Sequence, residues 1–327
     1  MSAAALPSAC ASGGSGDSAA PGGDDASVPG DGPLPEGAEA GGGEGGGGDG
    51  GIGASLTKAC ADNASTYCAQ LEQCAAFLFQ TQYGDNLTCV ARNTLACTDG
   101  VQAPGAGWTG DGLEACVKAR SALDCNTFLH GKPAPNACRV TGAITTSSKC
   151  RYDAQCGSGY CRYASGGLCG NCVNLGATGA PCTTSSDCDG NLMCAGTCQV
   201  PNGVGGGCGA TQPCQQGLVC AKGACAQPGV LGATCDPTLG GADCDYYQGF
   251  YCDGTSKTCK AYATPHDGQS CGGGAAVCFG GDTCFGGSCV APVQDGSPCN
   301  TDAGENCLAP SSCQTGLCQL YSATQCK

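Results

Sequence analysis

CTTSSDCDGNLMCAGTC, residues 182–198, places four cysteines in seventeen residues. The same plan returns at 208–225, 271–289 and 299–318, in a wider form at 235–259, and in a first unit that opens at Cys150. The common spacing is C-x(5–8)-C-x(4–7)-C-x(3–6)-C, followed by nine to eleven residues. A spacing that recurs in this way predicts an array of similar small units, six in all, over residues 150–326.

Cysteine is the dominant feature of the composition, with 35 in 327 residues. Leu, Ile, Val and Phe together supply only 40 residues, too few for a core that offsets the conformational entropy of so long a chain. The fold class that follows is small and disulfide-rich. We expect a low-complexity tether, a disulfide-pinned helical domain and an array of short β-hairpin or turn repeats.

The net charge of −14 argues against a nucleic-acid partner, because phosphate binding needs clustered Lys and Arg. No stretch approaches the length of a membrane-spanning helix. Disulfide-rich chains fold in oxidising compartments, so we expect an exported protein: an outer-membrane or cell-surface lipoprotein, or a secreted one.

The first ten residues, MSAAALPSAC, end on a cysteine that lies fifty residues ahead of the next. LPSAC resembles the lipobox of bacterial lipoproteins, in which small residues precede a cysteine that is lipidated after cleavage. Leu6 stands one place too far from Cys10, and only a short apolar stretch precedes it. We therefore expect residues 1–10 to be a signal-peptide remnant, with the true signal upstream and Cys10 lipidated; an incidental cluster in a disordered end is the alternative.

Residues 11–55 consist almost entirely of Gly, Ser, Ala, Pro, Asp and Glu, with eight acidic residues and no basic one. Such a composition predicts a disordered tether that would hold a folded part off a membrane. The alternative is a plain disordered terminus.

Residues 56–140 are expected to form a helical domain that contains eight cysteines. Apolar residues and cysteines recur at helical spacing from Cys60 to Leu78, which predicts one long amphipathic helix. A second helix should start at Asp85, a third after TGDG at 109–112, and a short fourth around Cys125 should end at Gly131. Four internal bridges are expected among eight cysteines: Cys60, Cys68, Cys74, Cys89, Cys97, Cys116, Cys125 and Cys138.

A glycine stands three places before the opening cysteine of every repeat after the first, at Gly179, Gly205, Gly232, Gly268 and Gly296. Glycine allows the positive φ that tight turns need. Each unit should therefore be two very short strands or turns clasped by two bridges, within the unit or to a neighbour, in a rod-like array. The structural cysteines predicted here include Cys150, Cys156, Cys161, Cys169, Cys172, Cys182, Cys188, Cys194, Cys198, Cys208, Cys214, Cys220 and Cys225.

Residues 150–198 read C-x5-C-x4-C-x7-C-x2-C-x9-C-x5-C-x5-C-x3-C. This spacing resembles the N-terminal cysteine-rich domain of Dickkopf proteins, including the C-x2-C at Cys169 and Cys172. The family has adjacent cysteines where this chain has Cys188 alone, so the resemblance does not carry over a pairing. It implies a secreted, non-enzymatic, protein-binding module, reused here in a chain that resembles multi-cysteine bacterial lipoproteins.

Metal sites are weaker interpretations of the same residues. A zinc ribbon needs two close cysteine pairs, and only Cys169 and Cys172 form one. DCDGN at 187–191 and ADCDYY at 242–247 offer close carboxylates, but their order differs from that of an EF-hand loop, and Asp-Gly is foremost a turn dipeptide. No metal and no cofactor are predicted.

Catalysis is not predicted either, because a thiol nucleophile must be free and have a base nearby. A redox role for Cys169 and Cys172 lacks the βαβ context of such motifs, so structural bridging is favoured. His130 and His266 are expected to be solvated, and Trp108 is expected in the core or as a lid of the helical domain, with an exposed ligand anchor as the alternative.

The function predicted from sequence is that of a lipid-anchored surface protein with a non-enzymatic binding or structural role. Its partner would be a protein or another component of the envelope surface, and Cys10 would link it to the membrane. The loops 199–207, 226–234 and 260–270 are the expected binding elements. Two alternatives remain: a secreted hydrolase inhibitor whose bait residue is Lys222 or Lys260, or another disulfide-framed loop binder, and a thiol protein that binds metal.

Overall fold

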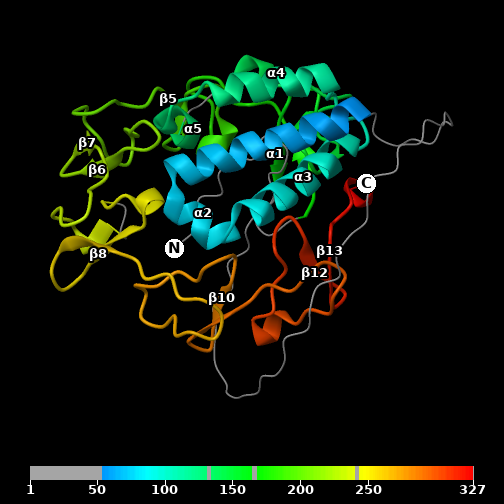
Figure 1. The fold of residues 1–327 in the computed structure, drawn as a ribbon. Coiled ribbons are helices and arrows are strands. Elements are labelled where there is room, and N and C mark those ends of the chain that lie inside the picture. The colour runs from blue at the N-terminus through cyan, green and yellow to red at the C-terminus, as the bar shows by residue number, and fades with distance from the viewer. Residues whose placement is uncertain (1–53, 131–133, 164–167, 240–242, 327) are drawn as a thin grey trace.

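The chain folds into a group of helices followed by a long series of two-stranded hairpins. The computed structural model describes residues 54–130, 134–163, 168–239 and 243–326. Figure 1 shows the helices gathered together, with the hairpin units running around them. This is the small disulfide-rich class that the cysteine spacing predicts, and seventeen disulfides link the 34 cysteines of the described residues.

Five helices form the first part of the structure, and their cysteine stripe is the one that the sequence predicts. The residues expected on the buried face, from Cys60 to Leu78, are all buried. The single helix expected there is two, because the backbone leaves helical geometry at Ala75 (φ −147°, ψ 60°). The helices are α1 (Ala54–Cys74), α2 (Ala76–Tyr83), α3 (Asn86–Gln102), α4 (Gly110–Ser121) and α5 (Cys125–His130).

Side-chain caps fix two of the helix starts. Asp85 precedes α3 and accepts a hydrogen bond from the backbone N–H of Thr88 at 2.8 Å, as its N-cap position predicts. Thr109 caps α4 by accepting from the N–H of Gly112, so this helix begins inside the TGDG segment rather than after it. The predicted stop at Gly131 lies outside the described residues.

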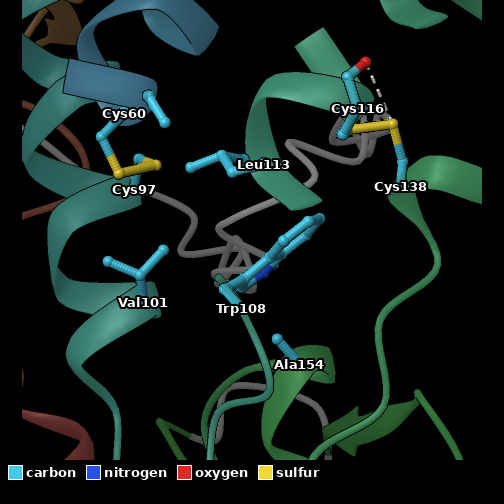
Figure 2. Close-up of a cluster of buried hydrophobic side chains, with 9 residues drawn as sticks. Cys60, Cys97, Val101, Trp108, Leu113, Cys116, Cys138 and Ala154 are labelled. Carbon is cyan, nitrogen blue, oxygen red and sulfur yellow. Dashed lines mark hydrogen bonds between the residues drawn. A yellow bond between two sulfur atoms is a disulfide. The ribbon is translucent and has the colours of Figure 1, made fainter. Parts of the chain in front are cut away.

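Sulfur and a few large side chains make up the helical core. Figure 2 shows the buried Trp108 beside Leu113 and Val101, between two disulfides, Cys60–Cys97 and Cys116–Cys138. Trp108 is 7% exposed, which confirms its place in the core and not as an exposed anchor. The remaining bridges of this part, Cys68–Cys89 and Cys74–Cys125, tie α1 to α3 and to α5.

Six short antiparallel sheets follow in the described part of the chain. The first has three strands, in the order β1 (Lys149–Cys150), β3 (Gly170–Cys172), β2 (Cys161–Tyr163). The other five are hairpins: β4 (Met193–Cys194) with β5 (Cys198–Gln199), β6 (Val219–Ala221) with β7 (Ala224–Ala226), β8 (Phe250–Asp253) with β9 (Thr258–Ala261), β10 (Thr283–Phe285) with β11 (Ser288–Val290), and β12 (Ser312–Gln314) with β13 (Leu317–Gln319). We number the repeat units 1 to 6, at 150–172, 182–198, 208–225, 235–259, 271–289 and 299–318.

The pairing of the cysteines is the same in every unit: the first bonds the third, and the second bonds the fourth. Unit 2 shows it with Cys182–Cys194 and Cys188–Cys198. The third and fourth cysteines lie opposite each other in the hairpin, so each takes its partner from the segment that precedes it. All bridges of units 2 to 6 therefore stay within their unit: Cys208–Cys220, Cys214–Cys225, Cys235–Cys252, Cys244–Cys259, Cys271–Cys284, Cys278–Cys289, Cys299–Cys313 and Cys307–Cys318.

The glycine three places before each opening cysteine makes a specific hydrogen bond. Gly179 has a φ of 84° and donates its N–H to the carbonyl of the fourth cysteine, Cys198, at 2.8 Å. Gly205, Gly232, Gly268 and Gly296 make the same bond to the fourth cysteines of their units. In unit 1 this position is Ser147, with a φ of 73° and a bond to the carbonyl of Cys172.

That bond identifies Cys172 as the fourth cysteine of unit 1, with the bridges Cys150–Cys161 and Cys156–Cys172. Cys169 is then an addition to the common plan. It bonds Cys326 near the end of the chain, across 157 residues. We call this bridge the clasp.

The clasp closes the repeat units into a curved belt around the helices, so the rod-like array expected from the sequence is wrong. Residues after Gly268 approach α2, and the C-terminal segment returns to unit 1, as Figure 1 shows. The physical reason is that the helical part offers side chains to units along the whole belt. No helix of the described ranges is long and apolar enough to span a membrane.

Candidate functional site

The surfaces of the belt that face the helices pack against helical side chains. Arg92 on α3 is the clearest example of such a side chain. Its guanidinium donates to the backbone carbonyls of Leu308 and Ala309 and to the carboxylate of Asp295, the last at 2.6 Å. The side chain of Arg92 is only 14% exposed. Because its partners lie in or beside unit 6, this residue ties unit 6 to α3.

A cluster of aromatic rings holds unit 4. Phe77 of α2 stacks on Tyr262 with ring centroids 5.6 Å apart and meets Tyr246 edge-on at 5.7 Å. Gln248 donates to the carbonyl of Cys74, at the end of α1, at 2.9 Å. Tyr262 belongs to the 260–270 segment, so this predicted binding loop is partly occupied by the helices.

The ends of the belt meet around Tyr152 and Ala323, which share a buried cluster with Ala103. The hydroxyl of Tyr152 donates to the carboxylate of Asp99 on α3. Burial is the largest cause that raises the pKa of the Tyr152 phenol, so it stays protonated at neutral pH. This network lies beside the clasp and seats the C-terminal segment on α3.

A cleft of about 370 Å³ lies between the start of α3 and units 5 and 6. The guanidinium donors of Arg92 at this cleft are used by Asp295 and by backbone carbonyls, and both oxygens of Asp85 bond Thr88. Its polar groups are thus engaged in holding the belt and capping α3. The cleft is lined by side chains that include Tyr83, Asp85, Thr88, Phe279, Pro292 and Leu308.

The carboxylates considered for calcium have structural partners. Asp187 is 6% exposed, and Arg162 and the N–H groups of Thr183 and Thr184 all donate to it. Burial would raise the pKa of this carboxyl, but these donors outweigh it and hold the pKa well below its usual range. In the second stretch, Asp245 caps the short helix η5 (Tyr246–Gln248).

Asp153 of unit 1 has the opposite environment. Burial raises its pKa to about 6, and the N–H of Cys161 donates to its carboxylate at 2.8 Å. The carboxyl sits at the start of a short helix, η2 (Asp153–Gln155), that leads to Cys156. This is a structural acid in a disulfide unit, and no motif around Asp153 marks it in the sequence.

All the cysteines predicted as structural are found in disulfides, from Cys60 to Cys225, while Cys10 lies outside the described residues. Within each of several units, three sulfur atoms lie within 4.8 Å of one another because the two bridges cross. Cysteine binds metal as a thiolate, so these clusters can hold an ion only after reduction. Cys169 and Cys172 bond different partners, so in this state they are not a reducible pair with each other.

His130 is not solvated as expected. Its ring meets Tyr247 edge-on with centroids 4.7 Å apart, and burial lowers the pKa of the imidazole. It joins α5 to the belt, since it also abuts Gly217 of unit 3. His266 is exposed and lies against the ring of Phe279, with centroids 4.4 Å apart.

The other two predicted binding loops are free of the helices at their apolar residues. Val200 and Val204 in 199–207 are 71% and 66% exposed, and Val230 and Leu231 in 226–234 are 65% and 61% exposed. The lysines suggested as protease baits do not lie in these loops. Lys222 occupies a two-residue hairpin turn with a φ of 51°, and Lys260 lies in β9 with its amine 3.2 Å from Asp253.

Comparisons with known proteins found no matching family model, no matching curated protein and no matching solved structure. The geometry described above therefore carries the functional argument.

Proposed function

We propose that this chain is an exported, lipid-anchored, cysteine-rich surface protein that binds a protein or another envelope component without catalysing a reaction. The observation that supports this most is the closed frame. Units clasped by their own bridges encircle a helical hub, and two connecting loops leave apolar side chains exposed to solvent. A frame of this kind loses little conformational entropy when it binds a partner.

Seventeen disulfides indicate an oxidising or extracellular environment. Every cysteine of the described ranges has a covalent partner, which leaves none of them as a thiol nucleophile or thiolate ligand. Lipidation at Cys10 would account for the cysteine that remains. The resemblance of unit 1 and unit 2 to Dickkopf domains supports the same kind of module, a secreted domain that binds proteins.

A count of thiols tests this proposal. The chain is expressed with a signal peptide, alkylated without reduction, then reduced and alkylated again, and weighed at both steps. We expect no free thiols, 34 released on reduction, and an added lipid mass that Cys10→Ser abolishes. Many free thiols in the native protein, with protons released on addition of Zn²⁺, would overturn the proposal in favour of a metal-binding thiol protein.

A further inference from the structure

Unit 3 and the loops that flank it form a segment of an acidic protein that has no acidic side chain. Residues 190–235 contain one charged side chain, Lys222, whereas residues 54–327 as a whole carry nineteen acidic and thirteen basic ones. Protein interfaces are depleted of charged residues at their centre. The surface of unit 3 has this property, and no other repeat unit with its flanking loops does.

Exposed apolar side chains gather on the same segment. Val200, Val204, Val230 and Leu231 are four of the seven large hydrophobic residues that are exposed in the described part of the chain. Val204 and Leu231 occupy equivalent places, four residues before the opening cysteines of units 3 and 4. In units 5 and 6 that place is taken by Asp267 and Asp295.

The segment is rigid, and the contact with the helices described above is that of Gly217 with His130. Two disulfides hold unit 3 together. The backbone of its fourth cysteine, Cys225, accepts a hydrogen bond from the N–H of Gly205 and donates one to the carbonyl of Gly206. Figure 1 shows β6 and β7 at the margin of the molecule, far from the C-terminus. A surface that is already ordered gives up little entropy on association.

We propose that this surface, residues 199–234, binds a second copy of the chain in a two-fold symmetric dimer. The charge distribution carries the choice of occupant. Two acidic copies repel each other wherever acidic surfaces meet, and this segment, which has no acidic side chain, is where they can approach without opposing carboxylates. A two-fold axis would place apolar loops against apolar loops, since the same patch serves both copies.

The size of the segment fits this assignment. A stable interface uses roughly 20–30 residues from each partner. Residues 199–234 number 36, so part of this one continuous, disulfide-clasped stretch is enough for such an interface. The dimer does not depend on the lipid anchor. It would bury the apolar side chains of the loops 199–207 and 226–234, so the second copy and the external partner proposed above would compete for these loops.

Analytical ultracentrifugation of the full chain tests the dimer. All samples carry Cys10→Ser, so that no intermolecular disulfide forms through that residue, and protein runs from 1 to 100 µM in 50 mM and 500 mM NaCl. The test variant is Val204→Asp with Leu231→Asp, which would bring like charges together across the axis. The control is Leu87→Asp on α3, which alters a side chain that is 84% exposed in another part of the molecule. Val204→Ser with Leu231→Ser is the milder second variant.

We expect the parent chain to dimerise with a micromolar dissociation constant that falls at high salt, because screening weakens the repulsion between acidic copies. The Asp pair should raise the constant at least 30-fold and the Ser pair should raise it less, while Leu87→Asp leaves it unchanged. Each variant is checked for complete disulfide formation by alkylation.

Three results would overturn the proposal: a monomer at 100 µM, a dimer that the loop variants leave intact, or one that Leu87→Asp weakens equally. A monomer that floats with phosphatidylcholine vesicles, and stops doing so in the Asp pair, would assign the surface to a lipid bilayer instead.

Discussion

Removal of the clasp is the most informative perturbation of this fold. Replacing Cys169 and Cys326 by serine leaves the common cysteine plan of unit 1 complete, because Cys150–Cys161 and Cys156–Cys172 remain. The change thus opens the belt without dismantling any repeat. The C-terminal segment would then be held only by contacts such as those of Ala323 with Ala103 and Tyr152.

The magnitude follows from the loop that the clasp closes. Its cysteines are 157 residues apart, and the chain-entropy relation gives about 5 kcal/mol for a loop of that length. The bridges of units 2 to 6 shorten the covalent path to roughly 95 residues, for which the same relation gives about 4.7 kcal/mol. We therefore expect the double variant to lose about 4–5 kcal/mol of unfolding free energy, an upper figure if the open chain retains structure.

The matched control is Cys182→Ser with Cys194→Ser, which removes a bridge across 12 residues in unit 2. The same relation gives about 2.8 kcal/mol for that loop. Guanidinium titration measures the unfolding free energy of both variants. Hydrogen exchange measures local opening, and it should rise over residues 318–326 in the clasp variant alone. A loss from the clasp variant no larger than that of the control would refute the reasoning, because the belt would then be held by its contacts and not by its closure.

Three further perturbations follow from single residues. Arg92→Ala should cost about 2–4 kcal/mol and increase hydrogen exchange around Leu308, because it leaves the partly buried carbonyl of Leu308 and the carboxylate of Asp295 without their donor; Lys58→Ala, which removes two exposed ion pairs, should change neither. Asp153 has a raised pKa of about 6, so the native state holds an extra proton between about pH 4 and 6, and unfolding free energy should fall by about 2–3 kcal/mol as pH rises through that window; Asp153→Asn should abolish this fall in guanidinium titrations at pH 4 and 7. Asp187 has a lowered pKa, so the stability that it contributes is present at neutral pH and is lost as pH falls towards that pKa; Asp187→Asn should destabilise the protein at pH 7, with a difference in melting temperature from the parent that narrows in acid.

The buried stripe of the first two helices could be predicted because helical periodicity is a local property. Every residue of the expected stripe from Cys60 to Leu78 is buried. The interruption at Ala75 could not be predicted, because alanine is a good helix former and no Gly or Pro marks the place. The turn lets Cys74 reach Cys125 and leaves its carbonyl for Gln248, so distant residues take part in the arrangement.

The disulfide pairing could be predicted from the sequence only in part. Four cysteines allow three connectivities, and spacing alone does not choose among them. The glycine before each opening cysteine was a usable signal for a turn, since Gly179 and its equivalents all have positive φ. Its hydrogen bond to the fourth cysteine requires the three-dimensional structure, and Ser147 shows that the same turn forms without glycine.

The contacts between the belt and the helices could not be predicted from the sequence. Arg92 and Leu308 are 216 residues apart, and nothing local to either residue indicates the other. The same holds for Phe77 with Tyr262 and for Cys169 with Cys326. Residue type was the only available signal, because an arginine on the face of an amphipathic helix that also carries cysteines is a candidate for burial.

The closed belt explains how a chain of this length folds with so few large apolar residues. A repeat unit of about twenty residues is too small to bury a core of its own, and two bridges supply what burial does not. Stacked units alone would still leave two open ends. Here the helical hub gives the belt a common surface, and the clasp joins unit 1 to the last residues. The inner face of the belt packs against the helices. We therefore expect a second copy of the chain, or an external partner, to bind the outer loops, where Val204 and Leu231 lie exposed.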